Sequence, residues 1–385
     1  MSRPVAPLDA AALAGALNPL GTATMLPAAA YTDPDVLRWE RRHLFAGSWL
    51  CLGRTDELAR DGEGEPLTQR AVLAGDIGVL LTFDAGAPRA FANTCRHRGH
   101  ELVVADDTAT STVVKCPYHS WVYGLDGALR TAPGFRDVEA FRREVQALVP
   151  LPCQSWHGWL FVNATADGVP LAAHLGAVDE LVAPYAPERL TLLARHAYDV
   201  AANWKVVGEN YHECYHCPQI HPELCAVTPP ASGENYRRPG AWVGGSMLLR
   251  AQTMSLDGRS GGRPIPGAPP GRVEYLGLLP NLLLSLHPDY VMTHRLLPLA
   301  PGRTWIECSW YFPDPDTDPA YAVRFWDLVN TQDWRACESV QRGLASPHFR
   351  PGPFAPTEDA VHQWAGMIAR AYLGRPPHDD PTETA

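Results

Sequence analysis

The sequence predicts an α+β protein in which a small β-rich domain precedes a larger domain of antiparallel sheet and helices. Short β-rich runs separated by turns fill residues 49–163, and the pattern becomes helical after residue 164. Further β-like runs and one long helix follow, and 385 residues are enough for two domains. We therefore expect residues 1–44 as an N-terminal segment packing with the second domain, 45–164 as the first domain and 165–385 as the second.

The first domain is predicted from an entering helix and several short strands. The helix spans residues 31–44, with Thr32 or Asp33 as its cap and Pro34 in the first turn, where proline is favoured. Strand-forming runs lie at residues 77–83, 121–123, 128–130 and 159–162. An Asp-Gly pair separates the two middle runs and predicts a tight hairpin between them.

The second domain is predicted to combine helices with a sheet. Helices are expected at residues 171–182, 204–216 and 318–344. Pro218 ends the second helix, and Asp318 caps the third. A stretch rich in glycine and proline predicts a mobile loop at 255–272. The β-like runs that supply the sheet are 281–287, 289–296 and 304–312.

The composition limits the classes of function. Hydrophobic residues make up 46% of the chain and charged residues 19%, which fits a globular protein with a sizeable core. A net charge of −10 argues against nucleic-acid binding and is compatible with a cationic substrate. Residues 1–20 do not read as a signal peptide, and no run approaches the roughly 20 apolar residues of a membrane span. We expect a cytoplasmic protein that does not contact membranes.

In a reducing compartment the nine cysteines are expected to be thiols, metal ligands or redox centres rather than disulfides. Nine is an odd number, so a complete set of disulfides within one chain is impossible. Cys214, Cys217 and Cys225 contain one C-x2-C pair but lack the fourth cysteine of a plant-type ferredoxin, and they are predicted to be buried thiols.

One constellation of possible metal ligands lies in the first domain. Cys95 and His97 form a C-x-H pair, and Cys116 and His119 form a C-x2-H pair. Two thiolates and two imidazoles suit a Rieske [2Fe-2S] cluster, in which the cysteines hold one iron and the histidines the other. Zinc is the alternative, although zinc fingers usually place both cysteines in one half and both histidines in the other.

A second constellation lies in the second domain. On a helix Glu209, Glu213 and His216 would share one face, and a turn at Pro218 would present His221 beside His216. Two such histidines can bind a metal, but many pairs are satisfied by carbonyl groups or water.

The long C-terminal helix offers a carboxylate that completes such a metal site. Asp333 falls on an apolar stripe at helical spacing, formed by Phe325, Val329, Ala336 and Val340. An unpaired buried carboxylate is costly, so Asp333 should either be neutralised or have a cationic partner, which is a metal ion or an arginine such as Arg335 or Arg342. Two histidines and one carboxylate with open positions are the facial arrangement of non-heme Fe(II) oxygenases.

In this order, the two constellations resemble the α subunit of a Rieske non-heme iron oxygenase. The resemblance runs from about Trp49 to Trp364 and rests also on the motifs at residues 156–163, 203–205 and 332–334. It implies a helix-grip-like catalytic domain and a Rieske cluster held by Cys95, His97, Cys116 and His119. It also implies a mononuclear Fe(II) held by His216, His221 and Asp333.

The resemblance further implies how electrons and oxygen are used. Members of the family assemble as head-to-tail homotrimers, so the cluster at His119 of one subunit would reach the iron at His216 of the next through Glu213. The cluster passes electrons to the iron, which activates O2 and inserts oxygen into the substrate. A separate NAD(P)H-dependent reductase, with or without a ferredoxin, supplies electrons; residues 243–246 lack the spacing of a dinucleotide site.

A glutamate at the bridging position distinguishes this sequence from most ring-hydroxylating members, which carry aspartate. With Glu213 at this position, the sequence resembles the group of carnitine, glycine betaine, stachydrine and choline monooxygenases. This resemblance implies hydroxylation or N-demethylation of a small amine or betaine. The alternatives are a ring hydroxylase or O-demethylase of an aryl or natural-product substrate, and an electron carrier or structural metal protein whose second site is empty. A quaternary ammonium ion would need an aromatic cage, for which the sequence offers Tyr211, Trp242, Tyr275, Tyr290 and Trp310 without selecting among them.

Overall fold

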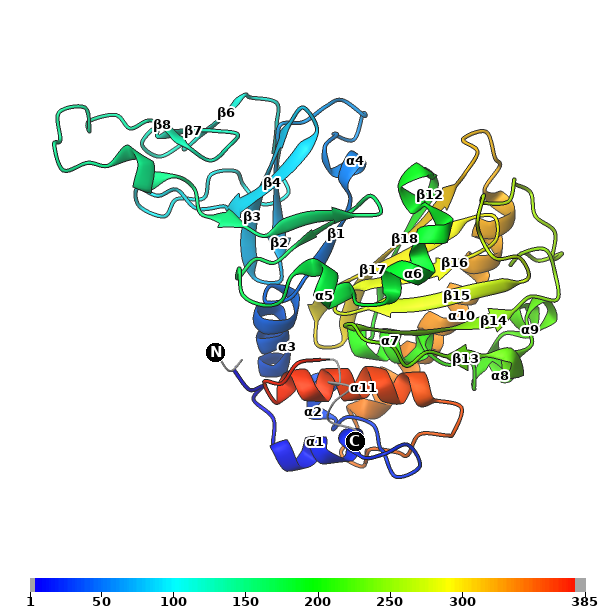
Figure 1. Ribbon diagram of the computed structural model, residues 1–385. Helices are drawn as coiled ribbons and strands as arrows, with labels where there is room; N and C mark the ends of the chain where they lie inside the picture. The colour runs from blue at the N-terminus through cyan, green and yellow to red at the C-terminus, as the bar shows by residue number, and fades with distance from the viewer. Residues whose placement is uncertain (1–3, 378–385) are drawn as a thin grey trace. The chain divides into compact units, whose positions relative to one another are not determined.

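The computed structural model describes residues 4–377, which divide into two compact units (Figure 1). The smaller unit is residues 41–169. The larger unit joins the described residues up to Glu40 with those from Pro170 onward. The chain therefore leaves the larger unit after Glu40, builds the smaller unit and returns at Pro170.

The smaller unit is built from three antiparallel sheets with the strand orders β5-β2-β3-β4-β9, β1-β11-β10 and β6-β7-β8. Their strands are β1 (Leu50–Arg54), β2 (Gln69–Ala74), β3 (Ile77–Asp84), β4 (Ala87–Ala92), β5 (Thr108–Ala109), β6 (Val113–Lys115), β7 (Val122–Gly124), β8 (Leu129–Thr131), β9 (Pro150–Leu151), β10 (Cys153–Trp156) and β11 (Trp159–Val162). Three short helices accompany them: η1 (Arg41–Phe45), α4 (Thr55–Leu58) and η2 (Arg143–Gln146). The four predicted strands and the predicted hairpin are confirmed as β3, β7, β8 and β11.

The core of the smaller unit surrounds two cysteine thiols. Cys95 and Cys116 are both buried in a cluster whose large members include Phe91, Trp121 and Tyr123. The tyrosine hydroxyl lies 3.4 Å from the Cys95 sulfur and accepts a hydrogen bond from the backbone N–H of Arg96. The apolar packing thus fixes the loop that carries Cys95.

The larger unit is built on a seven-stranded antiparallel sheet with the order β12-β18-β17-β16-β15-β14-β13. Its strands are β12 (Thr191–Val200), β13 (Glu234–Asn235), β14 (Trp242–Leu248), β15 (Arg272–Leu278), β16 (Leu282–Leu286), β17 (Val291–Ala300) and β18 (Arg303–Phe312). The three predicted runs are confirmed as β16, β17 and β18. Strands β12 to β15 were not predicted. β14 and β15 contain glycines at 244, 245 and 277, and glycine is disfavoured within strands.

Helices surround this sheet, and α7 packs against α10, α11 and β17. The helices are α1 (Ala10–Leu17), α2 (Ala29–Thr32), α3 (Pro34–Glu40), α5 (Leu171–Leu175), α6 (Val178–Val182), η3 (Ala183–Tyr185), η4 (Pro187–Arg189), α7 (Trp204–Tyr211), α8 (Cys217–Ile220), α9 (Pro222–Val227), η5 (Pro230–Ser232), α10 (Ala320–Leu344) and α11 (Asp359–Tyr372). The predicted helix at 171–182 is two helices, broken at Gly176, which has a positive φ of 54°. A Cβ atom there would lie 2.1 Å from the carbonyl oxygen of Pro239, so only glycine fits. Among the described helices, none combines the length and the apolar character that a membrane span requires.

The N-terminal segment belongs to the larger unit through both packing and polar contacts. α1 packs on α11, and the backbone N–H of Ala6 donates to the carbonyl of Tyr372. At the end of the segment, the buried carboxylate of Glu40 pairs with the buried ammonium of Lys205 at 2.6 Å. The indole N–H of Trp204 and the hydroxyl of Tyr372 also donate to Glu40, so this carboxylate is satisfied without water.

The segment between β14 and β15 has no helix or strand, as predicted, but its predicted mobility is contradicted by buried anchors. Thr253, Met254 and Ser255 are buried. The Asp289 carboxylate accepts hydrogen bonds from the hydroxyls of Thr253, Ser260 and Tyr321, which tie the segment to the sheet and to α10.

Candidate active site

The segment that carries the predicted metal ligands of the larger unit differs from the helix that the sequence predicts. α7 ends at Tyr211, and Glu213 and His216 follow it in an irregular turn. The Glu213 carboxylate accepts hydrogen bonds from the backbone N–H groups of Tyr215 and His216, and such local bonds compete with helix propagation. Pro218 stands in the first turn of α8 and so begins a helix instead of ending one.

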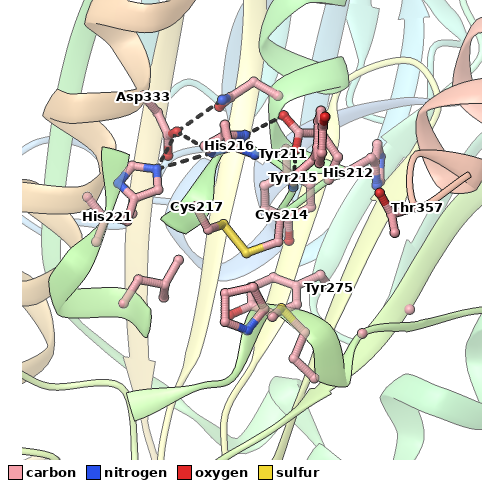
Figure 2. A pocket seen from close by; sticks show the side chains of 18 of the residues that line it. Tyr211, His212, Cys214, Tyr215, His216, Cys217, His221, Tyr275, Asp333 and Thr357 are labelled. Carbon is pink, nitrogen blue, oxygen red and sulfur yellow. Dashed lines mark hydrogen bonds and ion pairs between the residues drawn. A yellow bond between two sulfur atoms is a disulfide. The ribbon is translucent and has the colours of Figure 1, made fainter. Parts of the chain in front are cut away.

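Three side chains from separate elements meet at one point. Asp333 comes from α10, His216 immediately precedes α8, and His221 lies between α8 and α9. The two Nε2 atoms are 3.2 Å apart, and Asp333 Oδ1 lies 3.3 Å from His216 Nε2 and 2.9 Å from His221 Nε2 (Figure 2). Ligand atoms at right angles around a metal, each about 2.1 Å from it, are about 3 Å apart. The three donors therefore fit one metal ion without rearrangement.

Neighbouring side chains orient each of the three. His216 Nδ1 bonds to the Glu213 carboxylate, and His221 Nδ1 donates to the side-chain amide oxygen Oε1 of Gln332 at 2.7 Å. The side-chain amide of Asn210 donates to Asp333 Oδ1 at 3.0 Å. With Nδ1 of each ring occupied on the outside, Nε2 faces the common point, which is how metal-binding histidines are usually held.

The shifted pKa values of His216 and Asp333 agree with a site that binds a cation. Burial lowers the pKa of His216, but hydrogen bonds to Asp333 and Glu213 outweigh it and raise that pKa to about 10. Burial raises the pKa of Asp333, yet the two histidines hold it below its usual value. Positive charge is thus stabilised at the place where a metal would lie. Arg335 and Arg342, the alternative partners of Asp333, are exposed.

The stripe that places Asp333 on α10 was only partly predicted. Phe325 and Val329 are buried as expected, but Val340 is 43% exposed. Cys337 and Leu344 continue the buried face in its place.

A cavity of about 540 Å³ opens beside the three side chains, within the size range of small-molecule sites. Its aromatic lining consists of Tyr211, Tyr215, Tyr275, Trp326 and Trp334. Of the five aromatic residues that the sequence offered for a cage, only Tyr211 and Tyr275 reach the cavity. The contributions of Tyr215, Trp326 and Trp334 were missed, because all three depend on how α10 and the turn after α7 face the sheet.

A disulfide at the cavity wall contradicts the prediction of buried thiols. Cys214 and Cys217 are joined, with their Cα atoms 4.9 Å apart, across the turn that carries His216 (Figure 2). Cys225 is a free thiol, as predicted, but it is only partly buried. The C-x2-C spacing permits a disulfide as well as two thiols, and a reducing compartment would favour the thiols.

In the smaller unit the four predicted cluster ligands also come together, from two loops with the same backbone design. Cys95 and Cys116 each donate an N–H to the carbonyl five residues later and each accept from the N–H four residues later. The rings of His97 and His119 have centroids 4.6 Å apart. Among the described residues His97 Nδ1 is buried without a hydrogen-bond partner, which fits a nitrogen that binds a metal.

Comparisons with known proteins agree with this arrangement. Residues 187–374 match the catalytic-domain family "Ring hydroxylating alpha subunit", and residues 48–142 match the Rieske [2Fe-2S] domain. The oxygenase subunit of glycine betaine monooxygenase from Chromohalobacter salexigens is 31% identical over 86% of this chain and 82% of its own. The carnitine monooxygenase oxygenase subunit from Escherichia coli is 29% identical over 84% and 85%.

A solved structure shows the same fold. The quaternary ammonium Rieske monooxygenase CntA, in complex with an inhibitor, superposes with a TM-score of 0.75 at 24% identity, covering 96% of this chain and 100% of that one. The chain therefore belongs to the Rieske non-heme iron oxygenases, as an oxygenase α subunit of the ring-hydroxylating type.

Proposed function

We propose that this chain is the terminal oxygenase of a monooxygenase system that hydroxylates or N-demethylates a small amine or betaine-type substrate. The observation that carries the proposal is the convergence of His216, His221 and Asp333 beside a cavity rich in aromatic side chains. Relatives named for glycine betaine and carnitine support the substrate class. The names of these relatives, rather than the lining of the cavity, favour this class over an aryl substrate.

The family's two cofactors match the two donor sets. We propose that Cys95, His97, Cys116 and His119 hold the Rieske cluster, and that His216, His221 and Asp333 hold the mononuclear iron. When bound, these groups supply the electrons and the activation of O2. The protein's own task is to bind the substrate next to the iron site and to exclude water from it.

The aromatic lining suits a substituted ammonium ion. Such a cation is attracted to the faces of Tyr and Trp rings, and the attraction is stronger in a site with little water. Tyr211 is held by its hydroxyl, which donates to the carbonyl of Leu284 at 2.7 Å, so its ring has a fixed orientation. A cation placed among these rings would present its methyl groups to the three metal ligands.

Glu213 is the proposed link to the electron donor. It is fixed by two backbone N–H groups and holds Nδ1 of His216. We propose that in a homotrimer this carboxylate connects His216 with His119 of a neighbouring subunit. A separate NAD(P)H-dependent reductase, with or without a ferredoxin, would reduce the cluster, and the use of reduced nicotinamide supports a cytoplasmic location.

Product analysis with a reconstituted reductase tests this function. Release of formaldehyde, or formation of a hydroxylated amine, from betaine-like compounds would support it, and hydroxylated aromatic products with no turnover of amines would contradict it. Asp333→Ala should abolish turnover and reduce the iron content from about three to about two per chain. Asp327→Ala on the same helix is the control and should keep about three, because Asp327 bonds to Tyr198 away from the metal site. Two irons in the unmodified protein would indicate an electron carrier instead.

A further inference from the structure

The cavity has an unusual distribution of charge. Of the described residues that line it, none is lysine or arginine, whereas three are acidic: Glu213, Asp333 and Asp359. Among the described residues of the larger unit one lysine or arginine is buried, Lys205, and it is paired with Glu40. A ligand in this cavity therefore meets carboxylates and aromatic rings, and no permanent side-chain cation.

The metal does not reverse this balance. A divalent ion would carry two positive charges, of which Asp333 cancels one and Glu213, bonded to His216, cancels the other. Asp359 then leaves the cavity with one net negative charge.

Asp359 is held in place at the cavity wall. It lies in the first turn of α11, where the helix dipole favours its negative charge. The side-chain amide of Asn235, at β13, donates to Asp359 Oδ1, and both residues line the cavity. Its carboxylate is a built feature of the wall, since two separate elements position it.

We propose that the cavity selects a cationic amine that has no carboxylate, such as an amino alcohol, over a zwitterionic betaine, and that Asp359 determines this specificity. The inference rests on the proposed function and narrows its substrate class. A carboxylate that enters this cavity finds no lysine or arginine to pair with, and the net negative charge left by Asp359 repels it. The ammonium group of the same ligand is attracted by the same carboxylates and by the rings.

Three probes of similar size separate charge from shape: choline, glycine betaine and 3,3-dimethylbutan-1-ol, the uncharged analogue of choline. Dissociation constants with the iron-loaded enzyme and kcat/KM with a reconstituted reductase are measured for each. We expect choline to bind and react about tenfold better than either of the others. Binding of glycine betaine as tight as that of choline, or no binding of choline, would overturn the inference. If amines bind in the expected order but none is oxidised, the proposed function fails while the inference on charge stands.

Two variants with a matched control locate the effect. Asp359→Asn keeps an acceptor for Asn235 and should weaken choline binding about threefold to tenfold, with little change for the uncharged alcohol. Asp318→Asn makes the same change at an exposed position just before α10 and should leave the dissociation constants of all three probes unchanged. Thr357→Lys, at the cavity wall (Figure 2), adds a cation and should strengthen the binding of glycine betaine relative to that of choline. A ratio of choline to glycine betaine that neither Asp359→Asn nor Thr357→Lys alters would refute the role of Asp359.

Discussion

At the scale of single residues, Glu209 does not line the cavity, yet its buried carboxyl affects the stability of the fold. It is 9% exposed, and the hydroxyl of Tyr31 donates to it at 2.5 Å. Burial raises its pKa to about 7, although the bond from Tyr31 and the charge of Lys205 both act to lower it. The residue thus links the N-terminal segment to α7 and is easier to bury when it is protonated.

This shifted pKa makes the stability depend on pH. Because the folded-state pKa of about 7 exceeds the usual glutamate pKa of 4.5, the stabilising contribution of Glu209 is complete below pH 4.5 and is lost as the pH rises to 7. Over that window we expect the unfolding free energy of the wild type to fall, relative to Glu209→Gln, by about 3 kcal/mol. Urea unfolding at a series of pH values measures the difference. Glu234→Gln, at an exposed position of the same unit, should follow the wild type. A profile of Glu209→Gln that runs parallel to the wild type would show that folding does not raise the pKa of this carboxyl.

The residues of the site were predictable to different degrees. Cys95, His97, Cys116 and His119 stand in short motifs, so their spacing alone suggests a common site. Asp333 is more than a hundred residues from the histidines and was placed by helical periodicity. Residues that only orient others escaped prediction: an asparagine or glutamine such as Asn210 or Gln332 has no distinctive spacing, and its role appears only in the hydrogen bonds of the folded chain.

At the scale of elements, the turn between α7 and α8 is the clearest departure from expectation. Helical spacing placed Glu213 and His216 on one face of a helix, whereas they meet because Glu213 folds back onto the backbone of the turn. Periodicity does not reveal such local competition between a side chain and the helix. The residues were correctly selected, but for a geometry that the chain does not adopt.

The disulfide in this turn has a directly measurable consequence. Of nine cysteines, seven are free thiols and two are joined as Cys214–Cys217. Protein denatured anaerobically with an alkylating agent and a chelator, without reductant, should therefore take up about seven labels, and about nine after reduction. Mass spectrometry of the peptide containing residues 214–217 identifies the protected pair. Nine labels without reductant would mean that the pair is reduced in the isolated protein.

The segment between β14 and β15 provides a second test at this scale. Asp289→Ala leaves the hydroxyls of Thr253, Ser260 and Tyr321 without their acceptor, and we expect a loss of about 3 kcal/mol in unfolding free energy. Amide exchange in residues 249–271 should accelerate as the anchor is lost. Leu256→Ala, at a position of the segment that is 58% exposed, is the control and should leave both the unfolding free energy and the exchange nearly unchanged. Equal exchange in the two variants would show that Asp289 does not anchor the segment.

At the scale of the whole molecule, the fold class was predictable because three strands and the long helix α10 have clear periodic patterns. The division of the chain is less visible in the sequence, since the larger unit is assembled from two separated stretches. Helix α1 was missed, although its buried side chains Leu13 and Ala16 pack in the larger unit. A short alanine-rich helix gives little amphipathic signal, and only its distant partner α11 explains it.

A core substitution in α1 tests this assembly. Leu13→Ala removes a side chain that is 1% exposed, and we expect it to cost about 3 kcal/mol. Amide exchange should accelerate in α11, which packs on α1, and stay unchanged in β2–β4 of the smaller unit. Leu73→Ala, at a position that is 50% exposed in β2, should be nearly neutral. Faster exchange in β2–β4 with unchanged α11 would contradict the placement of α1 in the larger unit.

The bond from Ala6 to Tyr372 also has a consequence for the order in which the chain is made. Residues 41–169 form a continuous stretch, so all the strands of their sheets leave the ribosome before the rest of the chain has been translated. The N-terminal segment is synthesised first, yet its partners α7 and α11 emerge only much later. Domains generally fold as units during synthesis. The smaller unit is therefore expected to fold first. The N-terminal segment, although it is synthesised before the rest of the chain, is expected to pack against its partners last.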